Sequence, residues 1–280
     1  FLSHRLPIAE VAADKGIDMT VFADFTRPNK EIYKGFTFLK SPIKRTVVNF
    51  YSSLVEFFHL FMLIRHERPS VIHAVTLKPI IYLGIICFIL RIPFIASISG
   101  LGPAFTSTNY RGKVRLFIIK LIYKIIFSPN STRVICQSAY DSNVIVANGL
   151  AKTKKIIMVE GSGIDLEKFY PQNKSISGEI KILMASRLLK DKGVIEFCEA
   201  AGIIQRKNNF KVSFGLAGSI DSDSPSSLTE EEVIKICKSA NVKFLGNIDK
   251  LETILANTHI FILPSYYAEG IPKVLLEAAA

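Results

Sequence analysis

Short runs of apolar, β-branched residues alternate with longer helical patterns along nearly the whole chain. Residues 93–99 (PFIASIS) and 180–186 (IKILMAS) are two such runs, and each is followed by a helical pattern. Continuous β-branched runs are typical of strands that are buried on both faces, as in parallel sheets with helices on each side. The sequence therefore predicts an α/β fold built from doubly wound parallel sheets.

The alternation pauses once, at residues 160–179 (EGSGIDLEKFYPQNKSISGE), where Gly, Ser, Asn and Pro form a polar connector. A chain of 280 residues is long enough for two cores. We predict one Rossmann-like domain at residues 1–160, a connector at 161–179 and a second such domain at 180–280. Because doubly wound sheets bind ligands at the carboxyl ends of their strands, we expect the two domains to face a ligand cleft.

Basic residues are concentrated in the first half of the chain. Residues 1–160 contain 21 Lys and Arg against 9 Asp and Glu, whereas residues 161–280 contain 14 against 15. This one-sided charge predicts an anionic partner for the first half, such as a membrane surface, a phosphorylated lipid or nucleic acid. Nucleic acid is disfavoured, because the basic residues are not interleaved with aromatic ones and no helix-turn-helix or zinc spacing is present.

One stretch of this half, residues 112–127 (GKVRLFIIKLIYKIIF), suits a membrane surface. Lys113, Lys120 and Lys124 fall in one narrow sector of a helix, and apolar side chains cover most of the remainder. We favour a helix that lies among the headgroups of an anionic membrane, with a helix buried inside the fold as the alternative. No apolar run in the chain reaches the roughly 18 residues that a membrane-spanning helix needs.

Two cationic side chains follow the first strand of the second half. Arg187 and Lys192 would project at the carboxyl end of that strand, where a guanidinium and an ammonium can hold a phosphate. Further on, Glu269 and Glu277 flank a Gly-Ile-Pro turn that opens a helix, and they can accept hydrogen bonds from sugar hydroxyls. By spacing alone, both pairs are more typical of solvated surface.

The sequence indicates neither a metal site nor a nicotinamide site. The four cysteines are scattered without ligand spacing, and Asp221 and Asp223 lie in a Ser-rich loop that we expect to be solvated. Gly100 and Gly102 lack the third glycine of a dinucleotide fingerprint, because position 105 is Phe. We therefore expect the protein to use no metal and no cofactor.

Taken together, these stretches resemble the retaining, nucleotide-sugar-dependent glycosyltransferases of family 4, which have the GT-B fold. Residues 160–171 (EGSGIDLEKFYP) are similar to that family's interdomain segment, residues 182–193 (ILMASRLLKDKG) to its R-x4-K motif, and residues 269–277 to its E-x7-E motif. FLSHRLPIA, HAVTLKP and ASISGLG resemble the subgroup that extends undecaprenyl-diphosphate-linked sugars of capsule, O-antigen or glycoprotein glycans. The resemblance implies two Rossmann-like domains, the second of them incomplete, and a chain that is cut at both ends.

The resemblance also implies roles for single residues. Arg187 and Lys192 would hold the donor diphosphate and stabilise the leaving nucleoside diphosphate, while Glu269 would bind the transferred sugar and Glu277 the ribose. The other implied donor contacts are backbone and turn positions: Phe244, Gly246 and Asn247 near the base, and Gly100, Gly102, Gly270, Ile271 and Pro272 near the diphosphate. Many members have a histidine where this chain has Ser99-Gly100. His4 and His73 are weaker candidates, since a lone histidine that closes a strand is more often structural.

The function predicted from this resemblance is transfer of a hexosyl or N-acetylhexosaminyl group from a UDP-sugar to an undecaprenyl-diphosphate-linked saccharide. The reaction would proceed with retention of configuration at the inner face of the cytoplasmic membrane. One alternative is a truncated, inactive remnant that still binds a lipid surface or a nucleotide. A UDP-sugar epimerase shares the two-domain architecture, but the basic first half disfavours it.

Overall fold

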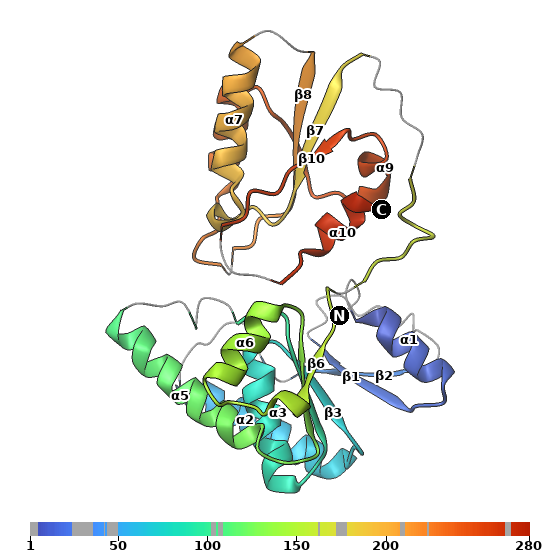
Figure 1. Ribbon diagram of the computed structural model, residues 1–280, viewed down its shortest axis with the longest axis vertical. Coiled ribbons are helices and arrows are strands. Elements are labelled where there is room, and N and C mark those ends of the chain that lie inside the picture. The colour runs from blue at the N-terminus through green and yellow to red at the C-terminus, as the bar shows by residue number, and fades with distance from the viewer. Residues whose placement is uncertain are drawn as a thin grey trace. The chain divides into compact units, whose positions relative to one another are not determined.

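The computed structural model of this chain describes residues 5–23, 36–41, 43, 50–101, 105, 109–161, 163–171, 178–207, 211–222, 224–266 and 270–280. The chain divides into two compact units, Phe1–Ser162 and Gly163–Ala280, and each unit is described by itself (Figure 1). The division lies at the start of the predicted connector. The extent of that connector, residues 161–179, stays a prediction.

The first unit contains α1 (Leu6–Asp14), β1 (Met19–Ala23), β2 (Phe36–Lys40), α2 (Phe50–Glu67), β3 (Ile72–Val75), α3 (Leu77–Leu90), β4 (Phe94–Ile98), α5 (Tyr110–Ile126), β5 (Thr132–Cys136), α6 (Ala139–Ala147) and β6 (Ile156–Met158). Its main sheet is parallel, with the strand order β3-β4-β5-β6. Within the described residues, β1 and β2 form a separate parallel pair. The strands of this half are thus parallel, as the sequence predicts.

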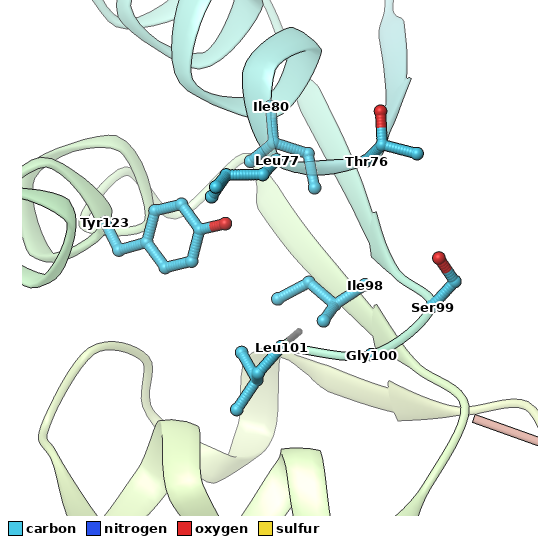
Figure 2. Close-up of a pocket in the computed structure, with 8 residues that line it drawn as sticks. All are labelled: Thr76, Leu77, Ile80, Ile98, Ser99, Gly100, Leu101 and Tyr123. Atoms are coloured by element: carbon cyan, nitrogen blue, oxygen red, sulfur yellow. The ribbon is translucent and has the colours of Figure 1, made fainter. Parts of the chain in front are cut away.

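Helix α3 lies in the core of the first unit, in contact with α2, α5, β3 and β4. Gly84 allows this close packing, because a Cβ at that position would lie 2.6 Å from Cδ1 of Ile126 on α5. Phe94, Ala96 and Ile98 of β4 are almost completely buried in the same core. This packing brings the first turn of α3 and the side chain of Tyr123 on α5 to the same pocket (Figure 2).

Helix α5 begins at Tyr110, two residues before the stretch 112–127 in which the sequence predicts a helix. Asn109 explains the difference, because its side-chain oxygen accepts a hydrogen bond from the backbone N–H of Gly112 at 2.7 Å. Asparagine is among the most favourable residues for capping a helix N-terminus. The start of α5 is therefore set by a polar N-cap residue, which the spacing of apolar residues does not indicate.

The second unit contains β7 (Ile180–Ala185), α7 (Val194–Arg206), β8 (Val212–Ala217), α8 (Glu230–Ser239), β9 (Lys243–Gly246), α9 (Leu251–Leu255), β10 (Ile260–Phe261) and α10 (Lys273–Ala279). Its sheet is parallel, with the strand order β10-β7-β8-β9. β10 has only two residues, whereas the apolar run at residues 259–265 (HIFILPS) predicts a longer strand. Because the chain runs from β7 to β9 on one side and returns to β10 on the other, this sheet is doubly wound.

Alternate residues of β7 face two different helical layers. Ile182 and Met184 pack in a core with residues of α7 and α8, whereas Leu183 and Ala185 pack in a second core with residues of α9 and α10. Figure 1 shows α7 on one side of this sheet and α9 and α10 on the other. The predicted α/β fold with parallel sheets, covered on both faces, is confirmed.

Candidate functional site

The strand order of the second unit brings two chain segments together at one edge of the sheet. β10 pairs directly with β7, with Ile260 opposite Ile182 and Phe261 opposite Leu183. Residues 186–193, which contain the predicted R-x4-K motif, follow β7, and residues 262–272 follow β10. This is the point at which the strand order reverses, and ligands of doubly wound sheets bind at such points.

Two contacts join these segments. The backbone N–H of Tyr266 donates a hydrogen bond to the carbonyl oxygen of Asp191, at 3.2 Å. Gly193 has a left-handed backbone, with φ of 79°, and a Cβ there would lie 2.4 Å from the carbonyl oxygen of Pro264. Glycine meets both demands, since it tolerates positive φ and has no Cβ. The R-x4-K loop therefore packs against the segment that leads into the E-x7-E motif.

Arg187 leaves the end of β7 and pairs with a carboxylate from the loop after β8. Its Nη1 lies 2.7 Å from Oδ2 of Asp221. The Asp221 side chain is 8% exposed, whereas that of Arg187 is 46% exposed. The expectation that Asp221 is solvated was wrong, because this carboxylate is buried against the guanidinium. The ion pair holds one terminal nitrogen of Arg187 and leaves the side chain open to solvent.

Lys192 is buried rather than solvated, with only 6% of the residue exposed. It is the last residue of a short 3₁₀ turn, Lys190–Lys192, which is followed in the sequence by Gly193 and α7. A buried ammonium needs hydrogen-bonding or anionic partners. Lys192 does interact with other residues of the protein. The structure thus holds this lysine inside the loop, which differs from the solvated pair that spacing alone favours.

Gly218, which follows β8, contacts both the end of β9 and the residue after β7. The N–H of Gly218 donates to the carbonyl oxygen of Gly246 at 2.8 Å, and a Cβ on Gly218 would lie 1.8 Å from the carbonyl oxygen of Ser186. Phe244 and Asn247 are predicted near the nucleotide base; Phe244 lies within β9, and Asn247 directly follows that strand. Strand β8 lies between β9 and β7, so these two residues are separated by one strand from the strand that carries the R-x4-K loop.

The E-x7-E motif is partly within the described residues. Glu277 lies on α10, where its Oε1 is 3.3 Å from Nζ of Lys273 and its side chain is 12% exposed. Pro272 is the N-cap of α10, so the Gly-Ile-Pro turn opens this helix as the sequence predicts. Gly270 and Ile271 lead into that cap. Glu269 lies outside the described residues.

Ser265 is a polar residue that belongs to none of the sequence motifs. Its hydroxyl oxygen is buried and has no hydrogen-bond partner among the described residues. It follows Pro264, which packs against Gly193, so it lies where the two loops meet. Buried hydroxyls are nearly always hydrogen-bonded, which makes Ser265 a candidate for contact with a ligand.

In the first unit, the predicted glycine turn follows β4. Gly100 has φ of 130°, and the next N–H, of Leu101, donates to Oδ1 of Asp141 at 3.1 Å. Asp141 is 3% exposed and also accepts a hydrogen bond from the Ser138 hydroxyl at 2.7 Å. This buried carboxylate anchors the turn to the start of α6, a role that sequence spacing did not reveal. Gly102 lies outside the described residues.

His73 has a structural partner within the sheet. Its Nε2 lies 2.7 Å from the hydroxyl oxygen of Ser97, which is fully buried on the neighbouring strand β4. The residue as a whole is exposed, but the ring is partly desolvated; this desolvation, and then the positive charge of Arg5, lower the pKa of His73, so the ring stays neutral at physiological pH. These contacts favour the structural interpretation of His73. His4 lies outside the described residues.

No helix within the described ranges is long and apolar enough to span a membrane. No group of three or more His, Cys, Asp and Glu side chains within those ranges is placed to hold a metal ion.

Comparison with protein families identifies the class to which this site belongs. Residues 2–138 match the model of the "Glycosyl transferase 4-like" family, and residues 166–280 match that of the "Glycosyl transferases group 1" family. The second match contains Arg187, Lys192, Glu269 and Glu277. The chain belongs to the glycosyltransferases. The resemblance that its motifs suggested is confirmed.

Relatives of this glycosyltransferase extend the match to the whole chain. It is 27% identical, over 305 aligned residues, to N,N'-diacetylbacillosaminyl-diphospho-undecaprenol alpha-1,3-N-acetylgalactosaminyltransferase of Campylobacter jejuni, covering 100% of this chain and 77% of that protein. Sucrose-phosphate synthase from Thermosynechococcus elongatus has a TM-score of 0.73 at 18% identity, covering 97% of this chain and 71% of that one. HepE from Anabaena, in complex with UDP and glucose, has a TM-score of 0.70 at 15% identity, covering 98% and 74%. These structural neighbours show that the glycosyltransferase has the GT-B fold.

Proposed function

We propose that this glycosyltransferase transfers a sugar from a UDP-sugar to an undecaprenyl-diphosphate-linked saccharide with retention of configuration. The observation that carries the proposal is the meeting of the R-x4-K loop with the segment after β10 at the switch point of the sheet. The Campylobacter relative is named for a diphospho-undecaprenol substrate, and the HepE structure holds UDP and glucose. These names support the acceptor and the donor of the proposed reaction.

The cations of the loop after β7 would stabilise the departing nucleoside diphosphate. Negative charge develops on the diphosphate as the sugar leaves, and preorganised cations at that place lower the barrier. Arg187 offers a planar guanidinium that Asp221 orients, and Lys192 offers a second positive charge from the same loop. We propose that these two side chains take the place of a metal ion, so that the reaction needs no cofactor.

The remaining predicted residues would bind the rest of the donor. Glu269 is proposed to accept hydrogen bonds from the transferred sugar, and Glu277 from the ribose. The other proposed contacts are Gly270, Ile271, Pro272, Gly100 and Gly102 at the diphosphate, and Phe244, Gly246 and Asn247 near the base.

The proposal is tested by incubating the purified chain with labelled UDP-sugars and a short-chain polyprenyl-diphosphate saccharide. We expect transfer from at least one UDP-sugar, unaffected by EDTA, and a product whose new linkage has the anomeric configuration of the donor by NMR. An inverted linkage would contradict retention. Calorimetric binding of the UDP-sugar without any transfer would instead support an inactive remnant that binds nucleotide.

We also propose that α5 binds an anionic membrane surface, at the inner face of the cytoplasmic membrane. One side of α5 packs into the core through Gly112, Ile119, Tyr123 and Ile126. The opposite side exposes a stripe of large apolar side chains, which includes Tyr110 at 81%, Phe117 at 69% and Leu121 at 53% exposure, together with Val114, Ile118 and Ile125. A helix that was wholly buried would not leave such a stripe in water.

Basic residues border this stripe on both sides. At 100° per residue, Lys113, Lys120 and Lys124 lie along one margin of the exposed apolar stripe, and Arg111 and Arg115 lie along the other. Residues 110–126 contain no Asp or Glu. An apolar face between two rows of cations is the pattern of a helix that lies in the headgroup region of an anionic bilayer.

Removing three of these cations should release the protein from anionic vesicles. The triple variant Lys113→Gln, Lys120→Gln, Lys124→Gln should bind phosphatidylglycerol-containing vesicles roughly 100-fold more weakly, at about 1 kcal/mol for each lysine. The variant Lys235→Gln, Lys238→Gln, Lys243→Gln removes the same charge from exposed sites in the second unit and should bind as the wild type does. Co-sedimentation with vesicles measures both, and equal losses in the two variants would rule out a specific role for α5.

A further inference from the structure

The loop after β8, residues 219–228, lies against the R-x4-K loop that follows β7. Strands β7 and β8 pair in parallel and lie side by side, so both loops leave the sheet at the same edge (Figure 1). The structure describes this β8 loop except for residue 223. The sequence predicts a solvated, Ser-rich connection here, whereas the structure joins it closely to the candidate site.

Backbone hydrogen bonds connect the β8 loop to the R-x4-K loop at three places. The N–H of Leu188 donates to the carbonyl oxygen of Ser219 at 3.0 Å, and the N–H of Leu228 donates to the carbonyl oxygen of Leu188 at 2.9 Å. The N–H of Lys190 donates to the carbonyl oxygen of Ser226 at 2.8 Å. The backbone between the two cations of the motif is therefore shaped by a loop that lies more than 25 residues further along the chain.

Buried leucines fix this arrangement from below. Leu188 is fully buried and Leu228 is almost so, and both belong to the core that contains α7 and α8. Leu189 forms an isolated antiparallel bridge with Ser227. The next residue, Thr229, is the N-cap of α8 and closes a capping box there. Because the β8 loop is attached to a strand at one end and to a capped helix at the other, it is a firm support for its neighbour.

Asp221 is the side chain that the β8 loop presents to Arg187. Its Oδ2 lies 2.7 Å from Nη1 of Arg187, and its carboxylate is buried. Its backbone carbonyl also accepts a hydrogen bond from the N–H of Ser224 at 2.9 Å, so the main chain at Asp221 is held in a turn. A long, half-exposed arginine side chain otherwise samples many rotamers. A fixed carboxylate restricts it to the few that keep this contact.

The sign of the charge at Asp221 argues for a role in orientation. A carboxylate beside a cation weakens the attraction of that cation for a phosphate, so it brings no advantage to simple anion binding. What the pair gains is a fixed direction, because the guanidinium is a rigid plane with five N–H donors. One terminal nitrogen faces Asp221, and the rest of the plane then has a defined position. Donors that are already oriented lower a barrier most where negative charge develops.

We infer that the β8 loop takes part in sugar transfer, with Asp221 as a positioning residue that fixes the guanidinium of Arg187 for the donor diphosphate. The inference rests on the proposed function, which gives Arg187 its role. It goes further in assigning control of kcat to a residue that acts through Arg187 and to a loop outside the family motifs.

The first test replaces Asp221 by asparagine, which keeps the size and a hydrogen-bond acceptor but removes the charge. We expect kcat to fall about tenfold, the difference between a charged and a neutral hydrogen bond. The affinity for UDP, measured by calorimetry, should stay within about threefold, since poorer orientation is offset by the loss of a repelling charge. Glu231→Gln removes a negative charge from an exposed site on α8 and should keep kcat and affinity within about twofold.

A double-mutant cycle shows whether Asp221 acts through Arg187. In the Arg187→Ala background, Asp221→Asn should lower kcat by less than about twofold, because the side chain that it positions is gone. An equal loss in both backgrounds would overturn the inference. So would a kcat of the single variant that matches the wild type, or a fall in kcat that is accompanied by an equal fall in UDP affinity, since a loosened loop would affect both.

Arginine side-chain ¹⁵N NMR separates this inference from the proposed function. The signals of Arg187, identified by their loss in Arg187→Ala, should show slow rotation of the guanidinium in the full chain and fast rotation in Asp221→Asn. This measurement needs no turnover, so unchanged rotation would overturn the inference even in a chain that transfers no sugar. Conversely, a chain that transfers sugar equally well with Asp221→Asn would retain the proposed function and lose the inference.

Discussion

Replacement of Arg187 by alanine should lower kcat for sugar transfer by about 10²–10³-fold, the usual cost of losing one preorganised donor to a developing negative charge. The effect should fall on kcat more than on the donor KM, because the charge on the diphosphate grows as the sugar departs. Arg187→Lys keeps the charge and loses the planar fork, so it should recover only part of the rate. Steady-state kinetics with a UDP-sugar donor measures all three enzymes.

The design must account for Asp221, which is 8% exposed and pairs with Arg187 at 2.7 Å. Arg187→Ala leaves this carboxylate buried beside an empty space, which lowers stability independently of catalysis. The double variant Arg187→Ala, Asp221→Asn also removes the buried negative charge of Asp221. It should regain stability in thermal unfolding but not activity, and this difference separates the two roles of Arg187.

A control is available at the opposite edge of the same unit. Arg206 ends α7, is exposed, and lies away from the carboxyl ends of the strands. Arg206→Ala should therefore keep kcat and KM within twofold of the wild type. The role proposed for Arg187 would fail if Arg187→Ala turned over within a few-fold of wild type.

Replacement of Lys155 by methionine should lower the free energy of unfolding of the first unit by about 3 kcal/mol. Nζ of Lys155 donates to the carbonyl oxygens of Phe127, Ser128 and Pro129 at 2.8, 2.7 and 2.7 Å. These carbonyls follow the end of α5, where a positive charge also interacts favourably with the helix dipole. The residue is only 4% exposed, so water does not readily replace the lost donor.

Lys154 provides a matched control, since it is the preceding lysine and is exposed. Lys154→Met should change stability by less than about 0.5 kcal/mol. Urea unfolding measures both variants, and hydrogen-exchange mass spectrometry should place the loss from Lys155→Met in α5 and β5 rather than in the second unit. A change below about 1 kcal/mol for Lys155→Met would mean that its three carbonyls are satisfied in another way.

Much of the fold follows from local pattern. The runs at residues 93–99 and 180–186 predict β4 and β7 because continuous burial requires continuous apolar character. The errors lie at element ends, as at Tyr110 and at β10, where a cap or the packing of one neighbouring strand decides the boundary. A helix cap or a strand end depends on one or two residues, so it does not appear in the periodicity of the sequence.

The candidate site also has some residues that the sequence predicts and others that only the structure identifies. Arg187 and Lys192 were found from a motif whose members lie close together in the sequence. The partners that give these residues their environment are distant: Asp221 follows another strand, and Pro264 follows β10. No local feature of the Ser-rich loop predicts that one of its aspartates is buried against a guanidinium.

The sequence by itself determined the alternation of strands and helices, the break between two units, the uneven charge and the family motifs, since each is written in neighbouring residues. Only the tertiary structure decided that β10 lies beside β7, that Arg187 is held by Asp221, and that Thr76 and Tyr123 meet at one pocket. The physical reason is that these contacts depend on strand order and on helix packing. Both are set by how whole elements bury their apolar faces together, which the period of any one segment does not specify.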